Sequence, residues 1–265
     1  MMEWLIVEKL DATGGSFVQI QYFKEYSSFL NRDMEFKMYG HAGPLCLVIP
    51  CQDGRFYEWE DRNMFKLMGN LIDQGRIQFV TVDSVDRETW SSFGETSWRM
   101  AQQENWVNYV MNELIPSALA KAGKSYDEPM MIMGASMGAT HAANLFFRFP
   151  RRFTRLLALS GIYDMSPYIY DGNFDGNFYQ NNPLSYLPNM DTAHEYIGIY
   201  NSNKAIFVVG QGAWENECQA DLRRLSDVLR GKGIHANINF WGYDIPHDWP
   251  SWERQVALYV PELLN

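Results

Sequence analysis

The fold is decided by Glu128-Pro-Met-Met-Ile-Met-Gly-Ala-Ser-Met-Gly-Ala-Thr-His141, in which a short apolar run ends at a serine flanked by small residues. Pro129 to Met133 has the length and apolar character of a buried strand. Ala139 to Phe147 is small and apolar at helical spacing. The stretch therefore predicts a strand, a sharp turn and a helix in immediate succession.

This succession is typical of a nucleophile elbow, in which a serine occupies a strained turn where strand and helix nearly touch. Gly134 and Gly138 supply the small neighbours that such a close approach needs. Ser136 is therefore the candidate nucleophile, at the head of a helix whose free N–H groups can stabilise a developing negative charge. The alternative interpretation is that Ser136 has no catalytic role and that the stretch is a glycine-rich structural turn.

The rest of the chain predicts an α/β fold around this elbow. Glu3 to Glu8, Phe17 to Phe23 and Asp33 to Tyr39 alternate as antiparallel strands, the first two joined at Gly14-Gly15. From Leu45 onward, strands alternate with helices, which predicts a mostly parallel central sheet with helices on both faces. Two of the expected helices cover residues 62–74 and 98–122, the second kinked at Pro116.

Length and composition favour one domain spanning residues 1–265. Hydrophobic residues make up 46% of the chain, and no low-complexity linker divides it. The net charge of −10, without an extended basic cluster, argues against nucleic acid as a partner. No apolar run reaches the roughly 18 residues of a membrane helix, and the first residues do not resemble a signal peptide. We therefore expect a cytoplasmic protein without a membrane partner.

Cysteines and histidines give no sign of a cofactor or a disulfide framework. The three cysteines, Cys46, Cys51 and Cys218, are odd in number and lack metal-type spacing, so we expect them to be reduced. The five histidines are scattered. We expect neither a metal site nor a cofactor.

A serine nucleophile needs a base, and the base needs a carboxylate that holds its tautomer. In a doubly wound hydrolase both lie on loops after the last two strands. His247 follows the last expected strand and is the candidate base. The preceding loop offers Glu215 and Glu217. We favour Glu215 as the orienting acid, because Glu217 fits the first turn of the next helix.

The oxyanion hole needs two main-chain donors. Met137, directly after the serine, is one candidate, and Gln52 in the loop after the first parallel strand is the other, with Asp53 or Cys51 as alternatives. An ordinary turn is the alternative interpretation of this loop.

Residues 161–202 form a long segment without clear periodicity, which we call the cover segment. Segments of this kind are commonly functional lids. Its glycines and aromatic side chains suit either a surface loop or the wall of an acyl pocket, with Phe178 and Tyr179 as substrate-binding candidates. Asp53 and Trp214 complete the predicted substrate-binding set. His194, in the cover segment, could also touch substrate, whereas His141 in the elbow helix is expected to be structural.

With these residues placed, the sequence resembles the α/β-hydrolase superfamily, in the esterase branch that includes esterase D-like carboxylesterases and the mycolyltransferases. The resemblance is carried by Gly134-Ala-Ser-Met-Gly138, Ala139-Thr-His-Ala-Ala143, Leu159-Ser-Gly161 and His247-Asp-Trp-Pro-Ser-Trp252. It implies a serine esterase with Ser136 as nucleophile and His247 as base. The sequence departs from the branch at Ala213, where many members carry the acidic residue.

The leading hypothesis is a carboxylic ester hydrolase that acts on a small-molecule ester with a small or aromatic acyl group. Acyl transfer to another alcohol is a related alternative, and a catalytically silent binding module is an alternative of another class, suggested by Ala213. A peptidase is disfavoured by the resemblance alone.

Overall fold

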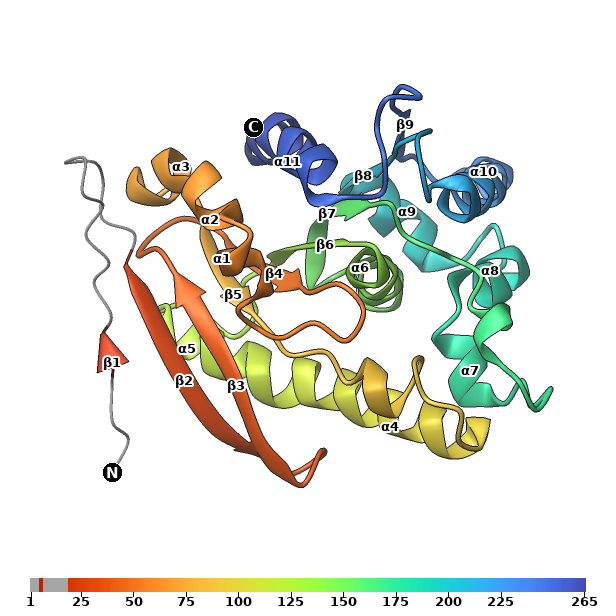
Figure 1. The fold of residues 1–265 in the computed structure, drawn as a ribbon, viewed down its shortest axis with the longest axis horizontal. Helices are drawn as coiled ribbons and strands as arrows, with labels where there is room; N and C mark the ends of the chain where they lie inside the picture. The colour runs from red at the N-terminus through yellow and green to blue at the C-terminus, as the bar shows by residue number, and fades with distance from the viewer. Residues whose placement is uncertain (1–4, 7–18) are drawn as a thin grey trace.

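The computed structural model describes residues 5–6 and 19–265, and within them the backbone forms one mixed sheet (Figure 1). The strand order is β1-β2-β3-β5-β4-β6-β7-β8-β9. The pairs β1–β2, β2–β3 and β3–β5 are antiparallel, and all later pairs are parallel. The strands are β1 (Leu5–Ile6), β2 (Ile20–Ser27), β3 (Arg32–Tyr39), β4 (Leu45–Ile49), β5 (Gln78–Thr81), β6 (Met130–Ala135), β7 (Phe153–Leu159), β8 (Lys204–Val209) and β9 (Asn237–Phe240).

This topology confirms the predicted fold class, including the antiparallel strands at the N-terminal edge. Leu5 and Ile6 pair with Tyr22 and Gln21 of β2, as expected for a hairpin. The predicted turn at Gly14-Gly15 lies outside the described residues.

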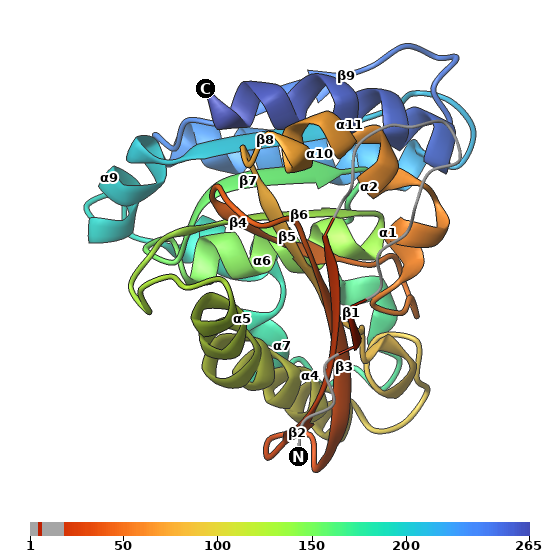
Figure 2. The ribbon, with the colours of Figure 1, turned by 90° about the vertical axis from the view of Figure 1, so that its left-hand side faces the viewer.

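The sheet separates two hydrophobic layers because side chains alternate along its strands. In β4, Leu45, Leu47 and Ile49 belong to one core cluster, whereas Cys46 and Val48 belong to the other. The first cluster contains residues of α4–α6 and α10, and the second contains residues of α1–α3 and α11. Figure 2 shows α4, α5 and α6 on the side of the sheet opposite α11, so helices cover both faces as the sequence predicted.

The helices are α1 (Glu58–Asp61), α2 (Met64–Leu67), α3 (Gly69–Asp73), α4 (Thr96–Tyr109), α5 (Ile115–Lys121), α6 (Met137–Arg148), α7 (Gly176–Gln180), α8 (Pro183–Tyr186), α9 (Glu195–Ser202), α10 (Asn216–Gly231) and α11 (Trp249–Leu264), with short 3-10 turns η1 (Asp86–Glu88), η3 (Ser166–Tyr168) and η4 (Leu187–Asn189). Among the described residues, no helix combines the length and apolarity that a membrane crossing requires.

Two predicted helices are interrupted in the structure. The helix expected over residues 62–74 is divided into short pieces, with Asn63 in the left-handed region at φ 58°. The long helix expected over residues 98–122 contains a π-helical turn, η2 (Val110–Leu114), directly before Pro116. Proline lacks the N–H that an α-helix needs at that point, so the irregular turn accommodates it.

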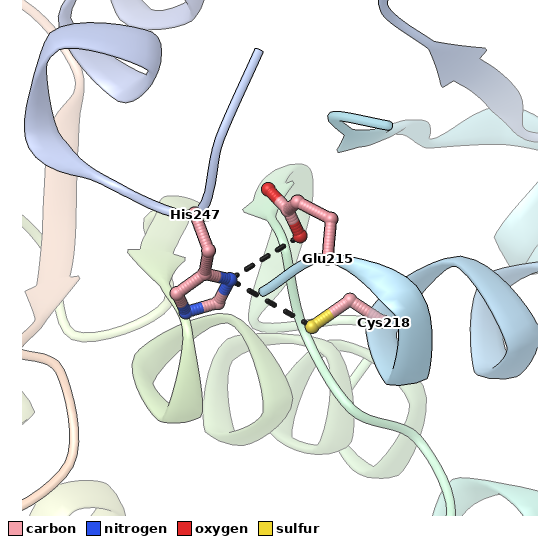
Figure 3. Close-up of side chains that lie close together, drawn as sticks. All are labelled: Glu215, Cys218 and His247. Atoms are coloured by element: carbon pink, nitrogen blue, oxygen red, sulfur yellow. Dashed lines mark hydrogen bonds and ion pairs between the residues drawn. The ribbon is translucent and has the colours of Figure 1, made fainter. Parts of the chain in front are cut away.

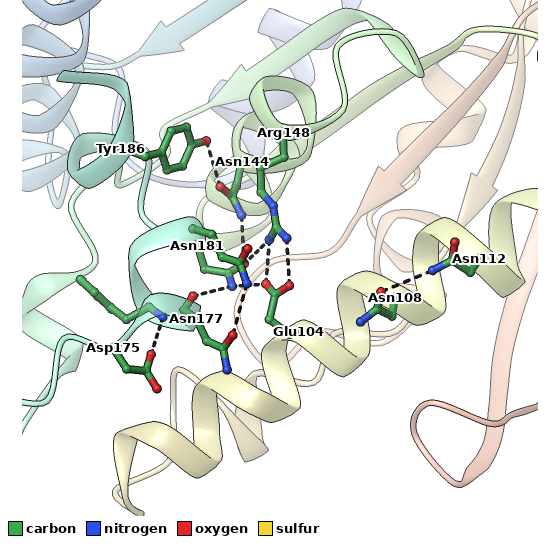
Figure 4. Close-up of polar contacts among 11 residues, drawn as sticks. Glu104, Asn108, Asn112, Asn144, Arg148, Asp175, Asn177, Asn181 and Tyr186 are labelled. Carbon is green, nitrogen blue, oxygen red and sulfur yellow. Dashed lines mark hydrogen bonds and ion pairs between the residues drawn. The ribbon is translucent and has the colours of Figure 1, made fainter. Parts of the chain in front are cut away.

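The cover segment contains α7, α8 and α9 and is joined to α4 and α6 by a polar network (Figure 4). Arg148 of α6 makes a bidentate pair with Glu104 of α4, at 2.7 and 2.9 Å. Asn181 of the cover segment donates to Glu104 and accepts from Arg148 and Asn144. Tyr186 donates to Asn144 at 3.0 Å. These buried bonds fix the cover segment to the elbow helix.

The close approach of α6 to the sheet explains the two elbow glycines. A Cβ atom on Gly134 would lie 2.3 Å from the main chain of Gly138, and one on Gly138 would lie 2.4 Å from the carbonyl oxygen of Pro50. Neither position has space for a side chain.

We expect Gly134→Ala to lower the free energy of unfolding by about 3 kcal/mol, because its methyl group would meet main-chain atoms that cannot move aside. Gly198→Ala is the matched control, since Gly198 lies within α9 and a Cβ atom added there would meet no heavy atom within 4 Å. That change should stabilise the helix by roughly 0.5–1 kcal/mol. Urea unfolding of both variants measures the difference, and equal midpoints would contradict this account of the elbow.

Candidate active site

Ser136 lies between the end of β6 and the start of α6, with φ 55° and ψ −127°. This backbone conformation is strained for a residue with a side chain. The N–H of Ser136 donates to the carbonyl of Leu159 in β7 at 2.8 Å, which holds the turn against the neighbouring strand. The geometry is that of the nucleophile elbow predicted from the sequence.

His247 lies on the loop after β9 and faces this serine. Its Nε2 is 2.9 Å from Oγ of Ser136. The loop is fastened to the one after β8, because Gly212 N–H donates to Ile245 and His247 N–H donates to the carbonyl of Ala213, both at 2.9 Å. Ala213 therefore contributes its main-chain carbonyl to the position of His247.

Glu215 meets the other side of the imidazole. Its Oε2 is 3.2 Å from Nδ1 of His247, and the side chain is fully buried (Figure 3). Glu217, the alternative acid, is exposed and lies in the first turn of α10. Of the two glutamates, the structure brings only Glu215 to the histidine.

Ser160, whose contact was not predicted from the sequence, holds this carboxylate, and Trp252 in turn holds Ser160. Ser160 donates its hydroxyl to Oε1 of Glu215 at 2.6 Å and accepts from the indole N–H of Trp252 at 3.1 Å. Ser160 is fully buried and has φ 55°, like Ser136. The motif Leu159-Ser-Gly161 was visible in the sequence, but nothing in it indicated a contact with Glu215.

In the loop after β4, the main-chain donors on either side of Gln52 are occupied. Cys51 N–H donates to Glu58 at 2.7 Å, and Asp53 N–H donates to Asp86 at 3.3 Å. No acceptor among the described residues bonds to the N–H of Gln52, which lies between them, or to that of Met137. Neither predicted oxyanion donor therefore makes an internal hydrogen bond in the part of the chain that the structure describes.

Asp86 links this loop to the elbow helix. Its Oδ1 is 2.8 Å from Nε2 of His141 in α6, and its Oδ2 accepts from Asp53, whose φ is 60°. Asp86 and His141 are both buried. His141 was expected to be structural and is bonded to Asp86, a partner that the sequence did not indicate because the two residues are 55 positions apart.

Cys218 was not predicted at the site, yet its Sγ is 3.8 Å from Nδ1 of His247. The thiol donates to the carbonyl of Ser160 at 3.2 Å. Burial, together with nearby carboxylates led by Glu215, raises the pKa of the Cys218 thiol well above its ordinary range. The thiol is therefore protonated at neutral pH and a weak nucleophile.

The predicted substrate-binding residues lie in different environments. Phe178 is 2% exposed and packs in a small cluster that includes Met137, so it supports the site from within. Tyr179 is partly exposed, and Trp214 is 87% exposed with φ 67°, directly before Glu215. The carboxylate of Asp53 accepts from Ser91 at 2.8 Å. His194 bonds within the first turn of α9.

The mostly parallel sheet, the elbow and the loops after β8 and β9 define an α/β-hydrolase fold. The chain belongs to the family described as "Putative esterase", whose model matches residues 27–260. It is therefore a carboxylic ester hydrolase by class, and the resemblance to the esterase family noted in the sequence is confirmed.

Solved structures with the same fold cover nearly the whole chain. A ferulic acid esterase is 16% identical, with a TM-score of 0.73, over 93% of this chain and 97% of that one. An S-formylglutathione hydrolase from Agrobacterium tumefaciens is 14% identical, with a TM-score of 0.72, over 98% of both. MPT51 from Mycobacterium tuberculosis is 14% identical, with a TM-score of 0.69, over 91% and 98%. A search of curated proteins found no match.

We expect Asp86→Ala to lower kcat by about tenfold to a hundredfold with little change in KM, because the loop that carries the Gln52 N–H would lose its anchor. Asp86→Asn should recover part of the rate, since an amide can still accept from Asp53. Glu113→Ala is the control, because Glu113 holds a different turn through Ser28. Steady-state kinetics on an activated ester would contradict this positioning role if Asp86→Ala and Glu113→Ala behaved alike.

Proposed function

We propose that the protein hydrolyses carboxylic esters through an acyl-enzyme on Ser136, with His247 as general base and Glu215 as the orienting acid. The observation that carries the proposal is the continuous series of contacts from Glu215 through His247 to Ser136, at 3.2 and 2.9 Å. Both distances are within the usual reach of catalytic hydrogen bonds.

In the first half-reaction, Oγ of Ser136 attacks the carbonyl carbon while Nε2 of His247 takes the hydroxyl proton. Glu215 accepts from Nδ1–H, which keeps the Nε2 lone pair directed at the serine and stabilises the imidazolium that forms. Ser160 and Gly210 donate to the other carboxylate oxygen, at 2.6 and 3.4 Å, and keep the carboxylate in place. His247 then protonates the departing alcohol.

The oxyanion of the tetrahedral intermediate would accept from the main-chain N–H groups of Met137 and Gln52. Donors already in place for the developing charge are worth most, because no reorganisation is needed during the reaction. The occupied donors on either side, Cys51 and Asp53, support the choice of Gln52. In the second half-reaction, water activated by His247 releases the acid and regenerates Ser136.

For the substrate, we propose an ester with a small or aromatic acyl group. Trp214 and Tyr179 offer exposed rings that could contact such a group. Two solved neighbours carry names that suit this range, ferulic acid esterase and S-formylglutathione hydrolase. A cytoplasmic location, inferred from the sequence, remains part of the proposal.

The alternative of a catalytically silent module rested on Ala213. That alternative supposed that no carboxylate lies beside His247, but Glu215 provides one next to Nδ1 of the imidazole. The contacts around His247 therefore favour a working enzyme.

A fluorophosphonate probe should label the purified protein at Ser136, because it tests activation of the nucleophile without a known substrate. Ser136→Ala and His247→Ala should each abolish labelling while thermal unfolding changes little. Peptide mass spectrometry identifies the modified residue. Labelling that survives in either variant, or occurs elsewhere, would refute the assignment.

The two neighbouring glutamates provide a matched pair for the acid. Glu215→Gln should lower kcat by about a thousandfold, because an amide cannot hold the imidazolium or fix the tautomer as a carboxylate does. Glu217→Gln, two positions further along the same segment, should stay within roughly twofold of the unmodified protein, since exposed side chains contribute little. Steady-state hydrolysis of one activated ester measures both, and the opposite ranking would transfer the acid role to Glu217.

A further inference from the structure

Glu215, Cys218 and His247 bring three different ligand atoms to one point (Figure 3). The carboxylate oxygen, the thiol sulfur and the imidazole Nδ1 all lie within 4.8 Å of one another. Ester hydrolysis uses Glu215 and His247 but gives Cys218 no role. The sulfur of Cys218 nevertheless lies close to Nδ1 of His247, the same ring nitrogen that the carboxylate of Glu215 contacts. Ester hydrolysis does not explain this contact.

The separations suit a tetrahedral metal ion. Zinc binds thiolate sulfur at about 2.3 Å and nitrogen or oxygen at about 2.0–2.2 Å, which places neighbouring ligand atoms roughly 3.3–3.6 Å apart. The observed distances from Nδ1 of His247 are 3.2 Å to Glu215 and 3.8 Å to Cys218. All three ligand atoms lie within 4.8 Å of one another, so side-chain movements of about 1 Å would complete three of the four ligands.

The charges also favour a dication. Three carboxylates, Glu215, Asp221 and Glu217, place negative charge around the Cys218 thiol. The same negative potential that opposes a free thiolate attracts a metal ion, and a bound metal deprotonates a coordinating thiol outright. The thiolate, imidazole and carboxylate set matches zinc or cadmium rather than magnesium or calcium. The imidazole is 20% exposed, which gives an ion a way to approach.

Metal binding at Nδ1 would reverse the tautomer that ester hydrolysis needs. The metal takes the Nδ1 lone pair, so the imidazole proton moves from Nδ1 to Nε2, and the Cys218 thiol releases its proton to solvent. Nε2 then faces Ser136 as a donor and can no longer accept the hydroxyl proton. Glu215, bound to the metal, no longer orients the ring for catalysis.

We propose that Glu215, Cys218 and His247 form an inhibitory site for Zn²⁺ and similar thiolate-binding divalent cations, which silence Ser136 by holding His247 in the inactive tautomer. The inhibitory part of this inference rests on the proposed function, whereas the metal site rests on the geometry alone. Inhibition is reversible, because no covalent bond to Ser136 forms.

The first test is a Zn²⁺ titration of ester hydrolysis in a buffer that does not bind metal. Zn²⁺ should inhibit the unmodified protein, and a chelator should restore the rate. Cys218→Ala should raise the half-inhibiting concentration by about tenfold or more, the scale expected when a metal site loses a supporting group. Cys46→Ala is the matched control, since Cys46 is also buried but lies in β4, and its response should equal that of the unmodified protein.

Equal Zn²⁺ sensitivity of Cys218→Ala and Cys46→Ala would overturn the proposal, because inhibition would then act through other groups. If Cys218→Ala does not fold, Cys218→Ser preserves the volume of the side chain and removes the soft ligand. The same loss of sensitivity is expected for the serine variant.

A second measurement needs no substrate. Co²⁺ added to the unmodified protein should produce the near-ultraviolet absorption of a thiolate–cobalt bond, and this band should be absent from Cys218→Ala and retained in Cys46→Ala. A band in a protein that hydrolyses no ester would support the metal site while the proposed function fails. Hydrolysis without a cysteine-dependent band would overturn the metal site and leave the proposed function intact.

Discussion

The close contact between α6 and the sheet is the constraint on which the site depends. Gly138 lies against the carbonyls of Ile49 and Pro50, and Gly134 lies against Gly138. This contact forces Ser136 into its strained turn at the head of α6. It also brings the end of β4 beside that helix, so the loop carrying Gln52 lies next to the elbow. Because Gly134 and Gly138 have no side chains, the helix can approach the sheet closely, and this approach determines where the candidate nucleophile and the predicted oxyanion donors lie.

The strand–turn–helix of the elbow, the mostly parallel character of the sheet and the position of His247 after the last strand could be predicted, because each depends on local pattern or on the succession of elements along the chain. Of the two candidate acids, Glu215 is buried against His247 and Glu217 is exposed, a difference that the sequence indicated only through the start of α10. Ser160, Asp86 and Cys218 could not be found in this way. Each of these residues contacts a segment that is distant in the sequence. The residues next to it in the chain therefore give no pattern from which the contact could be predicted.

Two helices that the sequence predicted to be continuous are interrupted in the structure. The apolar spacing of residues 62–74 is helical, yet Asn63 adopts a left-handed conformation and the segment forms short turns that follow the sheet surface. Pro116 was expected to bend a single helix, but the strain is absorbed one turn earlier as a π-helical turn. In both cases the backbone at one residue, the left-handed Asn63 or the proline at 116, interrupts a helix that the apolar spacing alone predicts to be continuous.

The network of Glu104, Arg148 and Asn181 has a consequence for how this chain can diverge. Each of these side chains bonds to the other two, and Asn181 is buried, so replacing one leaves polar groups without partners. A new cover segment grafted onto this scaffold would have to bring a residue equivalent to Asn181 or arrive with changes in both α4 and α6. Natural variation and loop exchange in this fold are therefore tied to two helices that lie outside the exchanged segment.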